Sequence, residues 1–116
     1  KETGVDSSVY KDLGLGQPTN PLTEKECLER GVFVMINEAA LALIEDKIVE
    51  TPQDVDLAMI MGTGFPPFRG GLLRYADSLG SKYVVEELEM YATKCGPRLK
   101  PTTPLSQMAA SSRSFY

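Results

Sequence analysis

The stretch from Met61 to Gly80, MGTGFPPFRGGLLRYADSLG, is the most constrained part of this chain, and the fold is worked out from it. It holds five glycines and the adjacent prolines Pro66 and Pro67, with Phe65 and Phe68 on either side of the pair. Glycine permits positive φ angles, whereas proline fixes φ and removes a backbone donor. Two phenylalanines in a turn indicate that the turn packs against a core or a partner. The stretch therefore predicts a rigid elbow between two helices.

Arg69 precedes the glycine pair Gly70 and Gly71 in this elbow. A guanidinium group presents a planar set of donors that suits a carboxylate, a phosphate or several backbone carbonyls. Two hypotheses follow for Arg69. It is either a structural clamp on helix-end carbonyls or on an acid such as Asp77, or a contact to a ligand. Asp77 is also placed to pair with Arg74 on the outer face of the helix after the elbow.

The helix before the elbow has a clear beginning. Thr51 is an N-cap residue, Pro52 suits the first helical position, and Asp54 stands at the third. Asp54 and Asp56 are interpreted as first-turn charges that complement the helix dipole rather than as a catalytic pair. The helix is predicted to run to Met61, with its methionines filling gaps in the core.

A longer helix is predicted upstream. Thr23 and Glu26 have the spacing of a capping box, and the helix should continue to about Asp46. From Gly31 onward its apolar residues cover most of the circumference, so it should lie at the centre of the fold.

Asn37 and Glu38 interrupt this apolar run, and polar groups in such a place need partners. One interpretation is that they lie at the rim or bind neighbouring backbone groups. The other is a polar contact across a domain interface.

Three shorter helices complete the prediction. Gly80 should close the first, Ser81 should cap the second, and Gly96 with Pro97 should stop it. No alternating strand pattern occurs in the sequence, which predicts an all-α, compact bundle of about four to five helices. Residues 1–22 are interpreted as a mostly extended linker or partly ordered segment, and residues 23–116 as the domain. The predicted ranges are Leu72 to Leu79, Lys82 to Cys95 and Thr103 to Ala110.

Composition limits the function. The net charge of −4 and the lack of a basic run argue against nucleic acid, and no apolar run approaches the roughly 20 residues of a membrane span. Cys27 and Cys95 are expected to be free, buried thiols in a reducing compartment. The chain has no histidine, which is the commonest general base and metal ligand. We therefore assign no catalytic, cofactor-binding or metal-binding residue to it.

Three segments carry a family resemblance: Asn37–Ala40, Thr51–Asp56 and the long elbow motif Gly62–Asp77. Together they resemble the C-terminal domain of 3-hydroxyacyl-CoA dehydrogenases, most closely its second copy in the multifunctional enzymes of fatty-acid β-oxidation. The resemblance covers about Thr23 to Pro104, and the ending Ser-Phe-Tyr is also similar. The elbow motif is specific, whereas the asparagine–glutamate pair alone is weak.

The resemblance implies that different domains of a longer parent enzyme have different roles. Such enzymes oxidise a 3-hydroxyacyl-CoA with NAD, and their histidine–glutamate dyad and cofactor site lie in a Rossmann domain outside this chain. The catalytic helical copy carries an asparagine before an arginine early in its first helix, whereas this chain has Glu29 before Arg30. The resemblance thus implies a non-catalytic domain whose partners are the Rossmann domain and a sister helical domain.

The interface and structural residues expected from these arguments lie on the central helix and around the elbow. They are Asn37, Glu38, Phe65, Pro66, Phe68, Arg69, Gly70, Gly71 and Asp77.

Two alternatives stay open, namely a lid in which Arg69 binds the CoA or acyl substrate, and a free-standing helical interaction module. Self-association of the isolated domain is a further open possibility. The expected compartment is the bacterial cytoplasm, with mitochondrion and peroxisome as alternatives.

Overall fold

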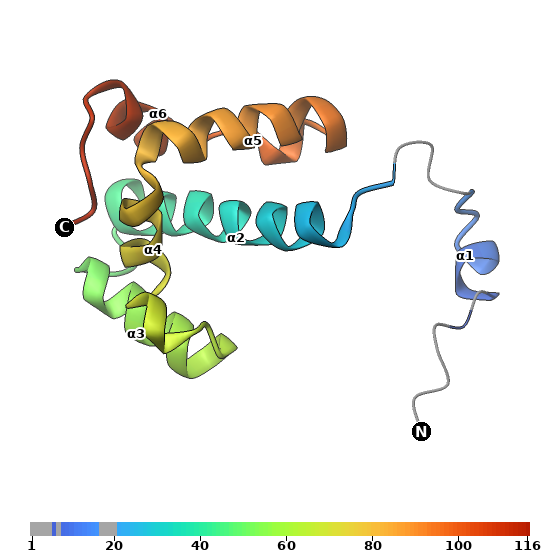
Figure 1. The fold of residues 1–116 in the computed structure, drawn as a ribbon, viewed down its shortest axis with the longest axis horizontal. Helices are drawn as coiled ribbons and strands as arrows, with labels where there is room; N and C mark the ends of the chain where they lie inside the picture. The colour runs from blue at the N-terminus through green and yellow to red at the C-terminus, as the bar shows by residue number, and fades with distance from the viewer. Residues whose placement is uncertain (1–5, 7, 17–20) are drawn as a thin grey trace.

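The chain is all-helical in the computed structural model, which describes residue 6 and residues 8–16 and 21–116. Figure 1 shows the helices as a bundle with α1 set apart, and no strand forms in the described residues. The predicted all-α class is confirmed. The α-helices are α1 (Ser8–Asp12), α2 (Glu24–Ala40), α3 (Pro52–Thr63), α4 (Leu72–Leu79), α5 (Ser81–Cys95) and α6 (Thr103–Ala110). The other helical turns are η1 (Leu41–Glu45), η2 (Pro67–Arg69) and η3 (Pro97–Leu99).

The capping box of α2 forms as predicted. The Glu26 amide donates to the Thr23 hydroxyl over 3.3 Å, and the Thr23 amide donates to the Glu26 carboxylate over 2.8 Å. The far end of the helix widens into η1, a π-helical turn in which the Asp46 amide donates to the Leu41 carbonyl. Lys47 then takes a φ of 55°, which ends the helix near the predicted position.

The central place of α2 is also confirmed. In Figure 1, α2 lies between α5 on one side and α3 on the other, and it also contacts α4. Phe33, Ile36 and Ala40 of α2 are buried in the core. The core residues from the other elements are Val55, Phe65, Leu72, Leu73, Ala76, Val84, Leu88, Tyr91, Leu99 and Leu105.

The N-terminal segment differs from its predicted extended form, because residues 8–12 form the short helix α1. None of its residues is buried. The predictions for residues 1–5, 7 and 17–20 lie outside the described residues.

Two local predictions for α5 are wrong. The helix begins at Ser81 itself, so Ser81 is not its cap, and the Ser81 hydroxyl donates instead to the Arg113 carbonyl over 3.0 Å. Cys95 was expected on the inner stripe but is exposed, and Tyr91 is buried on that face. Cys27 is exposed as well, so both cysteines are free as expected but neither is buried.

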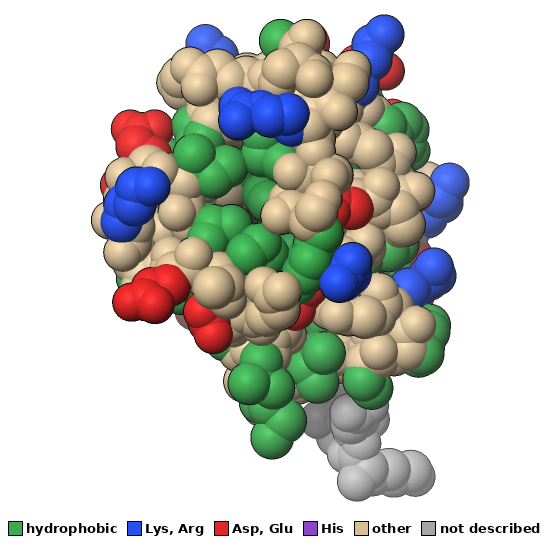
Figure 2. Space-filling model, turned by 90° about the vertical axis from the view of Figure 1, so that its left-hand side faces the viewer, with side chains coloured by type: hydrophobic (Ala, Val, Ile, Leu, Met, Phe, Trp, Pro, Cys, Tyr) green, Lys and Arg blue, Asp and Glu red, His purple; other side chains and the backbone are tan. Residues whose placement is uncertain are grey.

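Hydrophobic side chains gather on the face of the molecule that Figure 2 shows, at the left-hand side of Figure 1. A hollow between η1 and the C-terminal tail is lined by Leu43, Ile44, Met108, Arg113, Ser114 and Phe115. In the part of the chain that the structure describes, no helix combines the length and apolar character that crossing a membrane requires.

Candidate functional site

The elbow is a rigid connection between α3 and α4. Gly64 ends α3 with a φ of 73°, and the Phe65 amide donates to the Met59 carbonyl over 3.2 Å. Phe65 is 8% exposed and packs into the core. Gly70 and Gly71 follow η2 with φ values of 82° and 115°, which favour glycine. The backbone is thereby turned so that α4 begins beside α3.

Asp56 of α3 caps the N-terminus of α4. Its carboxylate accepts from the Leu73 amide over 2.6 Å and from the Arg74 amide over 3.3 Å, and the residue is 4% exposed. A Cβ atom on Gly71 would lie 2.3 Å from the Asp56 Cβ, so a glycine is needed there. The interpretation of Asp56 as a first-turn charge of α3 is therefore wrong. Its charge is stabilised by amides at the positive end of the next helix.

The C-terminal tail is bound to the same corner. The Tyr116 hydroxyl donates to the Asp56 carboxylate over 2.8 Å, and the Arg74 guanidinium lies 3.5 Å from the centre of the Tyr116 ring. Burial of the phenol, followed by its hydrogen bond to Asp56, raises the pKa of Tyr116 to about 12. The tail thus closes over the junction of α3 and α4.

Asp77 holds the tail backbone. Its carboxylate accepts from the Phe115 amide over 2.8 Å and from the Tyr116 amide over 3.1 Å. The predicted pair of Arg74 and Asp77 is wrong, because no ion pair joins them and Arg74 stacks on the tail instead.

Arg69 stacks on aromatic rings. Its guanidinium lies 5.0 Å from the centre of the Tyr75 ring and 5.6 Å from that of Phe68. Among the described residues it makes neither of the contacts proposed for a clamp, with helix-end carbonyls or with Asp77. Phe68 is 83% exposed and Pro66 is also exposed. The two phenylalanines of the elbow therefore point in different directions, one to the core and one to solvent.

Asn37 and Glu38 likewise differ in exposure, one pointing to the core and one to solvent. Asn37 is 2% exposed, and its amide group donates to the Lys100 carbonyl over 3.0 Å and accepts from the Thr102 amide over 2.8 Å. It therefore fastens the connector between η3 and α6 to α2, as expected if it bound backbone groups. Glu38 is exposed, and its role at a domain interface stays a prediction.

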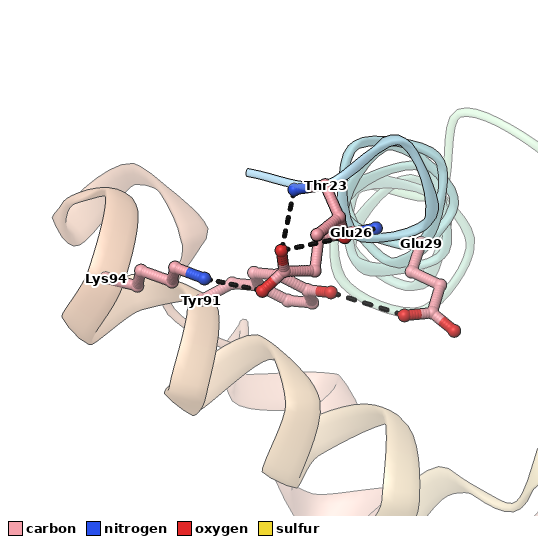
Figure 3. A network of polar contacts seen from close by, with 5 residues as sticks. All are labelled: Thr23, Glu26, Glu29, Tyr91 and Lys94. Atoms are coloured by element: carbon pink, nitrogen blue, oxygen red, sulfur yellow. Dashed lines mark hydrogen bonds and ion pairs between the residues drawn. The ribbon is translucent and has the colours of Figure 1, made fainter. Parts of the chain in front are cut away.

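A polar network that the sequence did not reveal joins α2 to α5 (Figure 3). Lys94 of α5 pairs with the capping residue Glu26, whose other carboxylate oxygen receives the Thr23 amide. The hydrogen bond from Lys94, followed by those from Thr23, lowers the pKa of Glu26 to about 2. Beside it the Tyr91 hydroxyl donates to Glu29 over 3.4 Å, and burial of the phenol raises the pKa of Tyr91 to about 12.

The arrangement as a whole fixes the chain's own backbone. Within the described residues, every fully buried polar side-chain atom has a hydrogen-bond partner. The buried amide and carboxylate, Asn37 and Asp56, contact backbone groups and Tyr116 rather than a cavity. These contacts define the class of protein: it is an all-helical domain whose buried polar side chains bind helix ends and connecting segments. Phe68 and Arg69 are exposed at its elbow.

The comparisons with known proteins place this domain within a longer kind of chain. No family model matches the sequence. Relatives named fatty acid oxidation complex subunit alpha match it over nearly its whole length. The one from Shewanella amazonensis is 46% identical over 97% of the chain, that from Shewanella loihica 45% identical over 100%, and that from Vibrio parahaemolyticus 41% identical over 100%.

The chain spans 16% of the length of each of these relatives. The match therefore indicates a domain of the fatty acid oxidation complex alpha subunit, and the expected relation to the multifunctional β-oxidation proteins is confirmed.

Proposed function

We propose that this chain is a non-catalytic helical domain of an NAD-dependent 3-hydroxyacyl-CoA dehydrogenase and enoyl-CoA hydratase of fatty-acid β-oxidation. In this proposal residues 23–116 form the domain and residues 1–22 a linker. The domain completes the dehydrogenase by pairing with a sister helical domain of the parent chain. NAD and the catalytic dyad belong to the parent's Rossmann domain. Relatives from bacteria support a bacterial cytoplasmic location.

The main support comes from Glu29, which stands where the catalytic copy of the domain has an asparagine. Its carboxylate receives the Tyr91 hydroxyl over 3.4 Å and lies 3.5 Å from the Lys25 amine. The contact with Tyr91 joins α2 to α5, whereas the contact with Lys25 lies within α2. Asn37, Asp56 and Asp77 likewise bind groups of this chain, which supports a structural role.

One observation favours a second candidate, the substrate-binding lid. Arg69 is exposed, its guanidinium lies over the Phe68 and Tyr75 rings, and within the described residues it takes part in no ion pair. In the full-length enzyme, Arg69→Ala separates the two roles. A raised KM with unchanged thermal stability supports the lid, whereas an unchanged KM excludes it. The third candidate, a free-standing interaction module, is disfavoured because the relatives carry this segment within a much longer chain.

A cleavable linker tests the main proposal. A protease site is placed between residues 16 and 21 of the full-length enzyme, which is cut in its native state and passed over a sizing column. We expect the cut domain to stay bound to the remainder and dehydrogenase activity to persist. An uncut form carrying the same site is the control. Release of the domain with full activity left in the remainder contradicts the proposal, as does a released domain that alone oxidises 3-hydroxybutyryl-CoA with NAD.

A further inference from the structure

We propose that the exposed apolar face of α3 and the elbow, defined by Leu57, Met61 and Phe68, is the surface that packs against the sister helical domain. This inference rests on the proposed function and names the residues through which the pairing takes place.

The exposure of these three side chains is the first argument. Leu57 is 62% exposed, Met61 78% and Phe68 83%. The expectation that methionines of this helix fill the core is therefore wrong for Met61. Within the domain α3 packs chiefly against α4, and Figure 1 shows it at the edge of the bundle, away from α5 and α6. Much of its circumference is consequently left uncovered by this chain.

The uncharged run of sequence that forms the face is the second argument. The run from Leu57 to Phe68 contains no Asp, Glu, Lys or Arg, although 24% of the chain is charged. Charged residues border the face: Asp54 lies before this run and Arg69 directly after it, where its guanidinium lies 5.6 Å from the centre of the Phe68 ring. Asp54 belongs to the capping box with Thr51, and the other acid of α3, Asp56, is buried beneath α4. Exposed apolar area with little charge is expected where another protein surface covers it.

The shape of the face suits a helix. Leu57 and Met61 are four residues apart and form one ridge along α3. Gly62 lies next to this ridge, and a Cβ atom built on it meets nothing within 4 Å. Helix ridges pack into grooves that small residues leave open. The proposed occupant is a helix of the sister domain in the parent chain, and the relatives leave room for one, because the chain spans only 16% of their length.

A second exposed apolar surface fits a partner less well. Leu28 of α2 is 66% exposed and Tyr83 of α5 is 42% exposed, beside a hollow of about 200 Å³. Charged residues accompany it: Glu29 lines the hollow, and Lys25 pairs with Glu29. Such a surface is readily solvated, so we use it as the control.

The test uses the cleavable full-length enzyme with two matched double variants. Leu57→Lys with Met61→Lys places charges on the proposed face, and Leu28→Lys with Met90→Lys places the same charges at exposed positions elsewhere. Once the linker is cut, we expect the first variant to release at least about ten times more domain than the wild type. The second should behave like the wild type. Circular dichroism of the cut mixture checks that the helices remain folded.

A glycine pair offers a second comparison that does not remove any apolar side chain. Gly62 and Gly31 are both exposed helical glycines with open space around them. Replacing an exposed helical glycine by glutamine favours the helix by up to about 1 kcal/mol. Gly62→Gln should nevertheless release the cut domain, because its side chain fills the groove, whereas Gly31→Gln should not.

The outcomes separate the inference from the proposed function. If the wild-type domain leaves the cut enzyme without loss of activity, the proposed function fails. If it stays, and the variants at Leu57, Met61 and Gly62 stay as well, the pairing holds but this face is wrong. If Leu57→Lys with Met61→Lys only converts a dimer of the whole enzyme into monomers, the face belongs to a second copy and the inference is overturned.

Discussion

The hydroxyl of Tyr116 donates a hydrogen bond to the carboxylate of Asp56, 60 positions earlier in the chain. The same carboxylate caps α4 through the amides of Leu73 and Arg74. One buried acid therefore joins α3, α4 and the C-terminal tail, and it does so directly beside the elbow. The orientation of α3, and with it the face that carries Leu57, depends on this junction.

Tyr116→Phe should destabilise the domain by about 1–2 kcal/mol, since it removes one hydrogen bond to a charged acceptor and leaves the ring in place. Urea denaturation of the wild type and the variant measures the difference. Tyr83→Phe is the control, because its hydroxyl has no hydrogen-bond partner among the described residues and its loss should change stability by less than about 0.5 kcal/mol. Equal effects of the two substitutions would mean that the bond to Asp56 contributes nothing.

The raised pKa of Tyr116 gives a separate, spectroscopic prediction. The folded-state pKa is about 12 and the ordinary value is 10.0. The contribution of the neutral phenol to stability is thus fully present below pH 10 and is lost as the pH rises through about 12. Absorbance of tyrosinate during an alkaline titration should show Tyr116 and Tyr91 among the late-titrating groups, and one late-titrating group fewer in Tyr116→Phe. Loss of an early-titrating group instead would contradict the assignment.

Gly71→Ala should destabilise the domain by about 3 kcal/mol or more, because strain at a positive φ adds to a steric clash. The new methyl group would lie 2.3 Å from the Cβ of Asp56. Gly64→Ala is the matched control, since its φ of 73° is also positive but nothing lies within 4 Å. It should cost only about 1–2 kcal/mol. Thermal unfolding of both variants measures the difference, and equal losses would show that contact with Asp56 is unimportant.

Sequence alone predicted the features that depend on neighbouring residues. The capping box at Thr23 and the N-cap at Thr51 involve a residue three positions away, and both form as expected. The helical class and the glycine-rich elbow follow from the same kind of local pattern.

The roles of Asp56 and Asp77 depend on contacts that no local pattern contains. Asp56 looked like an ordinary first-turn acid, yet its partners lie 17, 18 and 60 positions away. Asp77 bonds backbone 38 and 39 positions away instead of the nearby Arg74. The one available signal was Gly71. A glycine pair suggests that the backbone closely approaches another group, but it does not identify that group. The exposure of Cys95 and Met61 likewise depends on which helix face the rest of the fold covers.

Asn37→Asp should loosen the connector before α6. The substitution removes the donor to the Lys100 carbonyl and brings a negative charge against it, so we expect a loss of about 2–3 kcal/mol. The new carboxylate can still accept from the Thr102 amide, so the loss is measured by urea denaturation of the whole domain. Glu38→Gln is the control, because Glu38 is exposed and the domain itself should tolerate the change. Equal stability of Asn37→Asp and Glu38→Gln would contradict the proposed fastening.

Glu26 should make the stability of the domain depend on acid pH. Its pKa falls from an ordinary 4.5 to about 2, chiefly because of Lys94 and then Thr23. A lowered folded-state pKa means that its contribution is present above pH 4.5 and is lost as the pH falls toward about 2. Glu26→Gln should therefore lower the urea midpoint at neutral pH, and the gap to the wild type should narrow across this acid range.

Glu86→Gln provides the comparison for this titration. Glu86 also faces a lysine, Lys82, but at 3.9 Å and with 59% of its side chain exposed, so its loss should change stability little at any pH. Lys94→Met in the same series should reproduce most of the Glu26→Gln effect, because Lys94 is the principal cause of the lowered pKa. The contrary result is that the urea midpoints of the wild type and Glu26→Gln differ by the same amount from neutral pH to about pH 3. That result would show that Glu26 acts only through helix capping and that its charge does not contribute to stability.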